Sequence, residues 1–118
     1  ADRVGAIATR LQGAGVAPGC QVGVVLPRSS DHLASLLAIW RLGAVAVLID
    51  PAHPADRLGS LCARTPLQAI LLRDLDDGRR AGLRAGSLID VAELPHQATL
   101  PPPQALGELA YIAFTSGS

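Results

Sequence analysis

The sequence has 118 residues, about the length of one domain. Hydrophobic residues make up 49% and aromatic residues only 3%, so we expect a core built from aliphatic side chains. The formal net charge is zero, which gives no reason to expect a nucleic acid partner. No apolar run approaches the roughly 20 residues that a membrane-spanning helix needs, so no membrane association is expected.

The two ends of the sequence carry further expectations. Ala1, Asp2 and Arg3 form no apolar signal core, which favours a cytoplasmic protein, and a start without methionine suggests a piece of a longer chain. All ten basic residues are arginine, so no step that needs a lysine side chain can be assigned to this sequence.

Three helices are predicted from apolar residues at helical spacing. The first covers residues 2–14, the second ends at Gly43, and the third has Pro54 in its first turn. Three residues are candidates for the N-cap of the second helix: Ser29, Ser30 and Asp31.

Inward-facing side chains follow from the same spacing. On the second helix, four apolar side chains fall on one face and are expected to pack on the core: Leu33, Leu36, Leu37 and Trp40. Trp40 is the only tryptophan, and we expect it to be substantially buried. On the third helix the inward residues are Leu58, Leu61 and Cys62.

Short apolar runs rich in Val, Ile and Leu predict strands that are buried on both faces. These are residues 21–26, 44–49, 68–72 and 109–114, with a weaker strand at 87–91. The intervening residues 73–85 are expected to form a loop or a short surface helix. Alternating strands and helices predict an α/β fold with a largely parallel sheet, and such sheets bind ligands at the carboxyl ends of their strands.

The run at 109–114 leads directly into the hydroxyl- and glycine-rich turn Thr115-Ser116-Gly117-Ser118. A strand followed by such a turn is how a phosphate-binding loop begins, because glycine lets the backbone approach the phosphate while hydroxyl and N–H groups donate to its oxygens. By themselves these four residues are also compatible with an ordinary strand-to-turn connection.

Three segments in this order resemble the adenylation domains of nonribosomal peptide synthetases, within the superfamily of AMP-forming synthetases. They are residues 22–29, residues 41–58 and residues 109–118, and the resemblance spans essentially the whole chain. In the second segment the matching residues are Gly43, Ala44, Asp50, Pro51, Pro54, Ala55, Arg57 and Leu58. In the third they are Leu109, Ala110, Tyr111, Thr115, Ser116, Gly117 and Ser118.

The resemblance implies an N-terminal portion of an adenylation domain, with residues 1–118 ending inside the phosphate-loop motif. It implies that Thr115, Ser116, Gly117 and Ser118 bind the phosphates of ATP, and that an amino acid or other carboxylate is activated as its acyl-adenylate. Implied partners are a carrier-protein domain, which receives the acyl group on a phosphopantetheine thiol, and a neighbouring condensation domain. Mg²⁺ is implied as a cofactor, but its ligands and the catalytic residues belong to motifs downstream of this sequence.

Some positions depart from the family pattern. Ala46, Leu48 and His53 replace a tyrosine, a proline and a tyrosine, at positions expected to serve packing and the start of a helix. Asp50 is expected to cap the turn before Pro51. His32, His53 and His96 have no metal-ligand spacing, and the aspartates between residues 74 and 77 are expected to be solvated.

Two alternatives stay open from the sequence. One is a fragment of a free-standing acyl- or aryl-CoA ligase, which a downstream carrier-protein domain in the same reading frame would exclude. The other is a small, non-catalytic, doubly wound binding module, which a stop codon directly after Ser118 would favour. In the leading interpretation, the isolated 118 residues are expected to be inactive.

Overall fold

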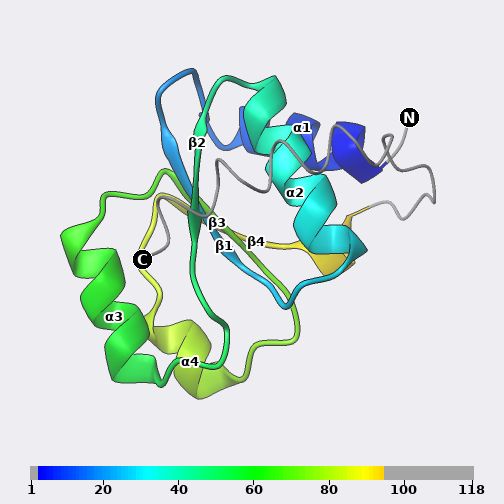
Figure 1. The fold of residues 1–118 in the computed structure, drawn as a ribbon. Helices are drawn as coiled ribbons and strands as arrows, with labels where there is room; N and C mark the ends of the chain where they lie inside the picture. The colour runs from blue at the N-terminus through cyan, green and yellow to red at the C-terminus, as the bar shows by residue number, and fades with distance from the viewer. Residues whose placement is uncertain (1–2, 95–118) are drawn as a thin grey trace.

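The computed structural model of the chain describes residues 3–94. Within this range helices and strands alternate, as Figure 1 shows. The helices are α1 (Arg3–Gly13), α2 (Ser30–Arg41), α3 (Ala55–Arg64), α4 (Asp77–Gly82) and the short 3₁₀ helix η1 (Val91–Glu93). The strands are β1 (Gln21–Val25), β2 (Val45–Leu48), β3 (Ala69–Leu72) and β4 (Ser87–Asp90).

The four strands form one sheet in the order β2-β1-β3-β4, and every neighbouring pair is parallel. On β1, for example, Gly23 lies beside Val47 of β2 and Ile70 of β3. The predicted α/β fold with a parallel sheet is therefore confirmed. The further strand predicted at 109–114 lies outside the described residues.

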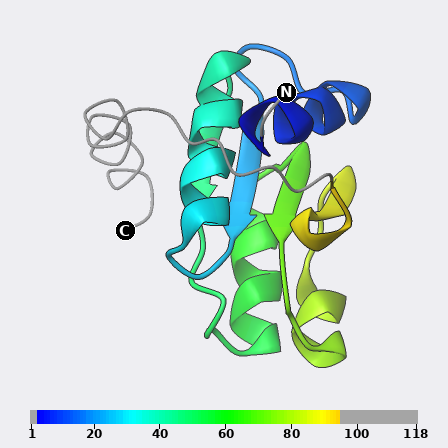
Figure 2. The ribbon, with the colours of Figure 1, turned by 90° about the vertical axis from the view of Figure 1, so that its right-hand side faces the viewer.

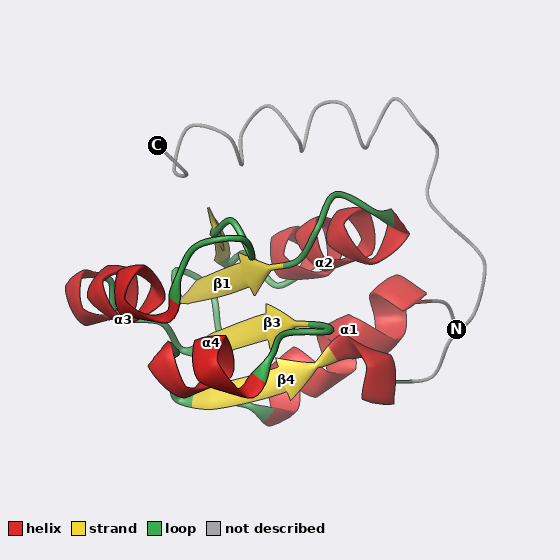
Figure 3. Ribbon diagram, turned by 90° about the horizontal axis from the view of Figure 1, so that it is seen from below, coloured by secondary structure: helices red, strands yellow, loops and turns green. Residues whose placement is uncertain are grey.

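Helices cover both faces of the sheet. Figures 1 and 3 show α1 and α2 on one side of the strands and α3 and α4 on the other. The central strand β3 is buried at every position, with Ala69 and Leu71 in the core beneath α1 and α2, and Ile70 and Leu72 in the core beneath α3. A strand buried on both faces has to be apolar at every position, which explains its uninterrupted aliphatic sequence.

The ends of α2 follow from local sequence. Ser29 is the N-cap, and its side chain accepts a hydrogen bond from the backbone N–H of His32 at 3.3 Å. At the other end, Gly43 adopts a left-handed φ of 72° and donates its N–H to the carbonyl of Trp40, while Ala44 donates to the carbonyl of Ile39. This paired arrangement explains why Gly43 ends the helix as predicted. None of the described helices is long and apolar enough to cross a lipid bilayer.

The prediction that Trp40 is substantially buried is wrong, because its side chain is 39% exposed. Small residues on another face of α2, Ala34, Ser35 and Ala38, are fully buried and let the helix approach its neighbours closely. Of the four predicted inward residues only Leu36 is buried, whereas Leu33 and Leu37 are half-buried. Of the predicted stripe only Trp40 is therefore exposed, and replacing Trp40 by alanine should cost less than the about 3–5 kcal/mol expected of a buried tryptophan.

The prediction that the strands are buried on both faces is confirmed for the inner strands of the sheet and is wrong for part of the edge strand β2. Val22 and Val24 of β1 are 0% and 1% exposed, as a strand between two neighbours requires. Val45 of β2 is 43% exposed and Val47 is half-buried. The difference arises because β2 is the first strand in the order rather than an inner one.

Tight packing between α3 and α4 depends on a glycine. A Cβ atom added to Gly82 would lie 2.5 Å from the carbonyl oxygen of Ala55, closer than any tolerated contact. We expect Gly82→Ala to lower the free energy of unfolding by about 1–3 kcal/mol, measured by urea denaturation, because the backbones must separate. Gly78→Ala in the same helix is the control. Its nearest neighbour would be 3.5 Å away, so equal losses in both variants would contradict this account.

Candidate functional site at the carboxyl edge of the sheet

The connections leaving the sheet part in opposite directions between β1 and β3. The chain leaves β1 toward α2 on one face, and leaves the neighbouring β3 toward α4 on the opposite face. In open parallel sheets, this reversal at the carboxyl ends of the strands is where ligands bind. The carboxyl edge between β1 and β3 is therefore the candidate site that the described fold defines.

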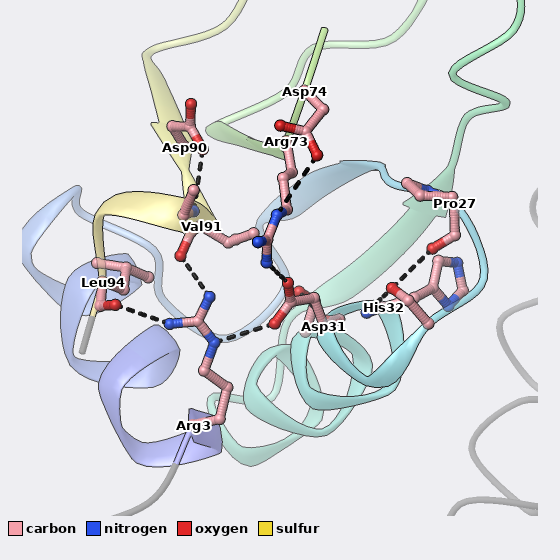
Figure 4. Close-up of polar contacts among 12 residues, drawn as sticks. Arg3, Pro27, Asp31, His32, Arg73, Asp74, Asp90, Val91 and Leu94 are labelled. Carbon is pink, nitrogen blue, oxygen red and sulfur yellow. Dashed lines mark hydrogen bonds and ion pairs between the residues drawn. The ribbon is translucent and has the colours of Figure 1, made fainter. Parts of the chain in front are cut away.

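A cluster of three charged side chains occupies this edge, as Figure 4 shows. Asp31, in the first turn of α2, accepts a hydrogen bond from Nε of Arg3 at 3.0 Å and another from Arg73, the residue that follows β3. Asp31 and Arg3 are 6% and 3% exposed, whereas the side chain of Arg73 is 38% exposed. The cluster thus joins the two connections that part at this point.

Arg3 also contacts the segment that follows β4. Its guanidinium also donates to the carbonyl of Leu94 at 2.9 Å and to the carbonyl of Val91. Both carbonyls lie just past the carboxyl end of β4. One buried arginine on α1 therefore links α2 to the segment after β4, with its charge balanced by Asp31.

Electrostatics keep the Asp31 carboxylate ionised. Burial acts to raise the pKa of Asp31, but hydrogen bonds from Arg3 and Arg73 and the charges of both guanidinium groups outweigh it, so the pKa lies below its ordinary value. The pKa of Arg73 is raised by its hydrogen bond to Asp31 and by that carboxylate's charge. A carboxylate held this firmly is a poor proton acceptor, so the cluster acts as a structural tie between elements.

Other polar groups at this edge have local structural roles. Asp50, after β2, accepts a hydrogen bond from the backbone N–H of Ala52 at 2.9 Å, which confirms its predicted role in the turn before Pro51. Asp76 caps α4 by accepting from the N–H of Arg79 at 2.8 Å. Within residues 3–94 no group of three or more His, Cys, Asp or Glu side chains is placed to hold a metal ion.

The four predicted phosphate-binding residues, Thr115, Ser116, Gly117 and Ser118, lie outside the described residues. Their role therefore stays a prediction. Of the positions that depart from the family pattern, Ala46 is buried in the core, Leu48 packs against that core, and His53 stands just before α3. These positions serve packing and the approach to a helix, as expected.

Sequence reasoning missed the Arg3–Asp31–Arg73 cluster. Asp31 was one of three N-cap candidates, but Ser29 has that role and leaves the Asp31 carboxylate free to face α1. A signal was available, because Asp31 and Arg73 both closely follow predicted strands and should therefore meet at the carboxyl edge. Arg3 is separated from Val91 by 88 positions, and no local pattern indicates such a contact.

His32 predicts a pH dependence of stability. Burial, and then the charge of Arg28, lower its pKa below the ordinary 6.5. As pH falls below about 6.5 the unfolded chain gains a proton that the folded chain does not, so stability should decrease toward the folded pKa. We expect His32→Gln to remove this contribution to the dependence of the free energy of unfolding on pH, which urea denaturation at a series of pH values measures. Identical slopes in both proteins would contradict the assignment.

Comparison with known proteins places this parallel α/β chain in a family of nucleotide-using enzymes. The family model "AMP-binding enzyme" matches residues 1–118, and the chain belongs to this family. Nonribosomal peptide synthetase penN of Penicillium thymicola is 36% identical over 123 residues, which cover 94% of this chain and 4% of that protein. AMB antimetabolite synthetase AmbB of Pseudomonas aeruginosa is 36% identical over 117 residues, which cover 96% of this chain and 9% of that protein.

Solved structures agree with this assignment. A four-domain nonribosomal peptide synthetase bound to AMP and glycine superposes with a TM-score of 0.69 at 27% identity, over 92% of this chain and 8% of that one. A fatty acyl CoA synthetase of Mycobacterium tuberculosis superposes with a TM-score of 0.67 at 19% identity, over 74% of this chain and 19% of that one. The second similarity concerns the fold alone. In each comparison this chain corresponds to a small part of a much longer protein.

Proposed function

We propose that this chain is part of an adenylation domain, in which a carboxylic acid, in the first place an amino acid, is activated with ATP. The observation that carries the proposal is the family match over residues 1–118, with a nonribosomal peptide synthetase at 36% identity among the relatives. The parallel sheet supports it, because its carboxyl edge is the part of such folds that receives nucleotides.

In the proposed reaction a carboxylate oxygen of the substrate attacks the α-phosphorus of ATP. A bond forms between that oxygen and phosphorus, the bond to the β-phosphate oxygen breaks, and pyrophosphate leaves with its electron pair. A carrier-protein thiol then attacks the acyl carbonyl, and AMP leaves. Both steps place charge on phosphate oxygens, which preorganised donors stabilise.

The residues of this chain that we assign to the reaction are Thr115, Ser116, Gly117 and Ser118. Three hydroxyl groups and the backbone N–H groups would donate hydrogen bonds to the phosphates of ATP, chiefly those that leave as pyrophosphate. Gly117 has no side chain to obstruct the approach of a phosphate. In this role the four residues bind and orient ATP and leave proton transfer to other groups.

Mg²⁺ is part of the proposal only for the longer protein. The charged cluster at the edge does not fit a magnesium site, because its single carboxylate is already bound by Arg3 and Arg73. Magnesium prefers carboxylate oxygens that keep free lone pairs and bound water. We therefore derive no step through Mg²⁺ from the described residues.

Amino-acid-dependent exchange of labelled pyrophosphate into ATP tests the proposal. The longer protein that contains this chain should exchange with one or a few amino acids. The 118 residues alone should show no exchange, because they offer no lysine to the phosphates. Their dissociation constant for ATP should be above about 1 mM, which corresponds to a binding free energy of less than about 4 kcal/mol. Exchange by the isolated chain would contradict the proposal that these residues are only a part of an adenylation domain. Transfer of the acyl group to coenzyme A rather than to a carrier protein would identify an acyl-CoA ligase instead.

A further inference from the structure

The segment after β4 has little local structure to hold it in place. Here η1 is a 3₁₀ helix of only three residues. The N–H of Ala92 donates to the carboxylate of Asp90 at 2.9 Å, and the N–H of Leu94 donates to the carbonyl of Val91 at 3.2 Å. A single helical turn is unfavourable by itself, because fixing its backbone angles costs more than its few hydrogen bonds return. Tertiary contacts are therefore needed to hold this segment.

Arg3 supplies such contacts from α1, which lies next to the segment in Figure 2. Its guanidinium donates to the carbonyl of Val91, the first residue of η1, and to that of Leu94, the C-cap (Figure 4). Nε of the same group donates to Asp31 at 3.0 Å. We call these contacts the Arg3 clamp. Because the guanidinium is planar and its donors have a fixed geometry, the Arg3 clamp holds η1 against α1 in one orientation.

The Arg3 clamp also fixes the direction in which the chain leaves the sheet. Leu94 has a φ of −90° and a ψ of 156°, the extended conformation that residues before a proline prefer. Pro95 comes next, and the ring of a proline restricts its φ angle. The carbonyl of Leu94 belongs to the planar peptide group that joins these two residues, so the hydrogen bond from Arg3 orients that plane. Few rotatable angles then separate the clamp from the residues that follow.

The chain that starts at this point leads to the predicted phosphate-binding residues. Residues 95–108 form the connection, and residues 109–114 and then 115–118 follow it. A connection that leaves the sheet in one direction has fewer conformations than one that leaves it freely. Less conformational entropy is then lost when residues 115–118 take up the arrangement that a phosphate requires.

We propose that Arg3 is a positioning residue for ATP, because the Arg3 clamp raises the fraction of molecules in which residues 115–118 are placed to bind phosphate. This role rests on the proposed function, whereas the clamp itself does not. When only a fraction of a protein is competent to bind, its apparent dissociation constant equals the intrinsic one divided by that fraction. Loss of the clamp should therefore weaken ATP binding and leave the rate at saturating ATP nearly unchanged.

Proteolysis of the 118-residue chain tests the Arg3 clamp without a nucleotide. The chain has two glutamates: Glu93 is exposed in η1, and Glu108 belongs to the connection. A glutamate-specific protease can cut after Glu93 only when η1 opens. Arg3→Lys keeps a positive charge beside Asp31 but lacks the planar group that reaches both carbonyls. We expect it to raise the initial rate of cleavage at Glu93 about tenfold relative to Glu108, measured by mass spectrometry of the fragments.

Gly82→Ala is the matched control for this experiment. It should destabilise the contact between α3 and α4, which lie on the face of the sheet opposite α1. If cleavage at Glu93 reported only global unfolding, Gly82→Ala would increase it as well. A ratio of cleavage at Glu93 to cleavage at Glu108 that is unchanged in Arg3→Lys, or that rises equally in Gly82→Ala, would overturn the clamp.

Pyrophosphate exchange in the longer protein tests the positioning role. We expect Arg3→Lys to raise the KM for ATP about fivefold and to keep the rate at saturating ATP within about twofold of the original. Gly82→Ala should leave the KM for ATP unchanged, because it lowers stability without altering the clamp. An unchanged KM in Arg3→Lys, or an equal increase in Gly82→Ala, would overturn the positioning role. Absence of exchange in the unmodified protein would contradict the proposed function instead, and the cleavage ratio would still decide whether the clamp exists.

Discussion

Replacing Asp31 by asparagine should lower the free energy of unfolding by about 3 kcal/mol, the cost of leaving a buried cation without its counter-charge. Arg3 is 3% exposed, and its guanidinium would lose its negatively charged partner while it still donates to the carbonyls of Val91 and Leu94. Urea denaturation followed by far-ultraviolet circular dichroism measures the loss. The difference in free energy of unfolding between the two proteins should become smaller as pH falls through the depressed pKa of Asp31, because protonation then neutralises the same carboxylate in the original chain.

Asp74→Asn is the matched control. Asp74 pairs with Arg73 at 3.6 Å, but its side chain is 87% exposed, and such pairs contribute about 0–1 kcal/mol. Asparagine also tolerates the left-handed φ of 53° at this position. Equal losses in Asp31→Asn and Asp74→Asn would show that burial of the cluster does not determine its contribution.

Replacing Gly117 by valine in the longer protein should reduce the rate of pyrophosphate exchange about a hundredfold or more. A β-branched side chain would obstruct the approach of phosphate to the backbone, and losing one preorganised donor typically has an effect of this size. The exchange rate at saturating amino acid and ATP measures it.

Gly107→Val in the connection before the phosphate loop is the control and should leave exchange nearly unchanged. The thermal unfolding midpoint of each variant shows whether a loss of exchange comes from the phosphate site alone or from a less stable fold. Retained exchange in Gly117→Val would remove this glycine from the proposed phosphate site, whereas loss in both variants together with a lowered midpoint would indicate damage to the fold.

The fold was predictable because local patterns and tertiary structure agree in this chain. The run at 68–72 is too short for a helix and too apolar for a surface strand, and it forms the fully buried β3. Gly43 was correctly predicted to end α2 because a left-handed residue is needed there. For residues 73–85 the sequence predicts a loop or a short surface helix, and the six-residue helix α4 lies within this range.

What sequence reasoning could not supply is which of two apolar faces packs inward. On α2 Trp40 is exposed and Leu33 and Leu37 are half-buried, whereas the core side of the helix consists of Leu36, Ile39 and the small residues Ala34, Ser35 and Ala38. Helical spacing identifies both faces but does not rank them when a helix is apolar on most sides. The buried cluster was missed for a related reason, since Arg3 meets Asp31 and Val91 only after the sheet has assembled.

The most direct test of the proposed reaction follows the oxygen atoms of the substrate. An amino acid that carries heavy oxygen in its carboxylate is incubated with ATP and the longer protein that contains this chain, and the products are analysed by mass spectrometry. Attack of the carboxylate on the α-phosphorus predicts one labelled oxygen in AMP and none in pyrophosphate. Formation of ADP with the label in inorganic phosphate would mean attack at the γ-phosphate, and would contradict adenylate formation.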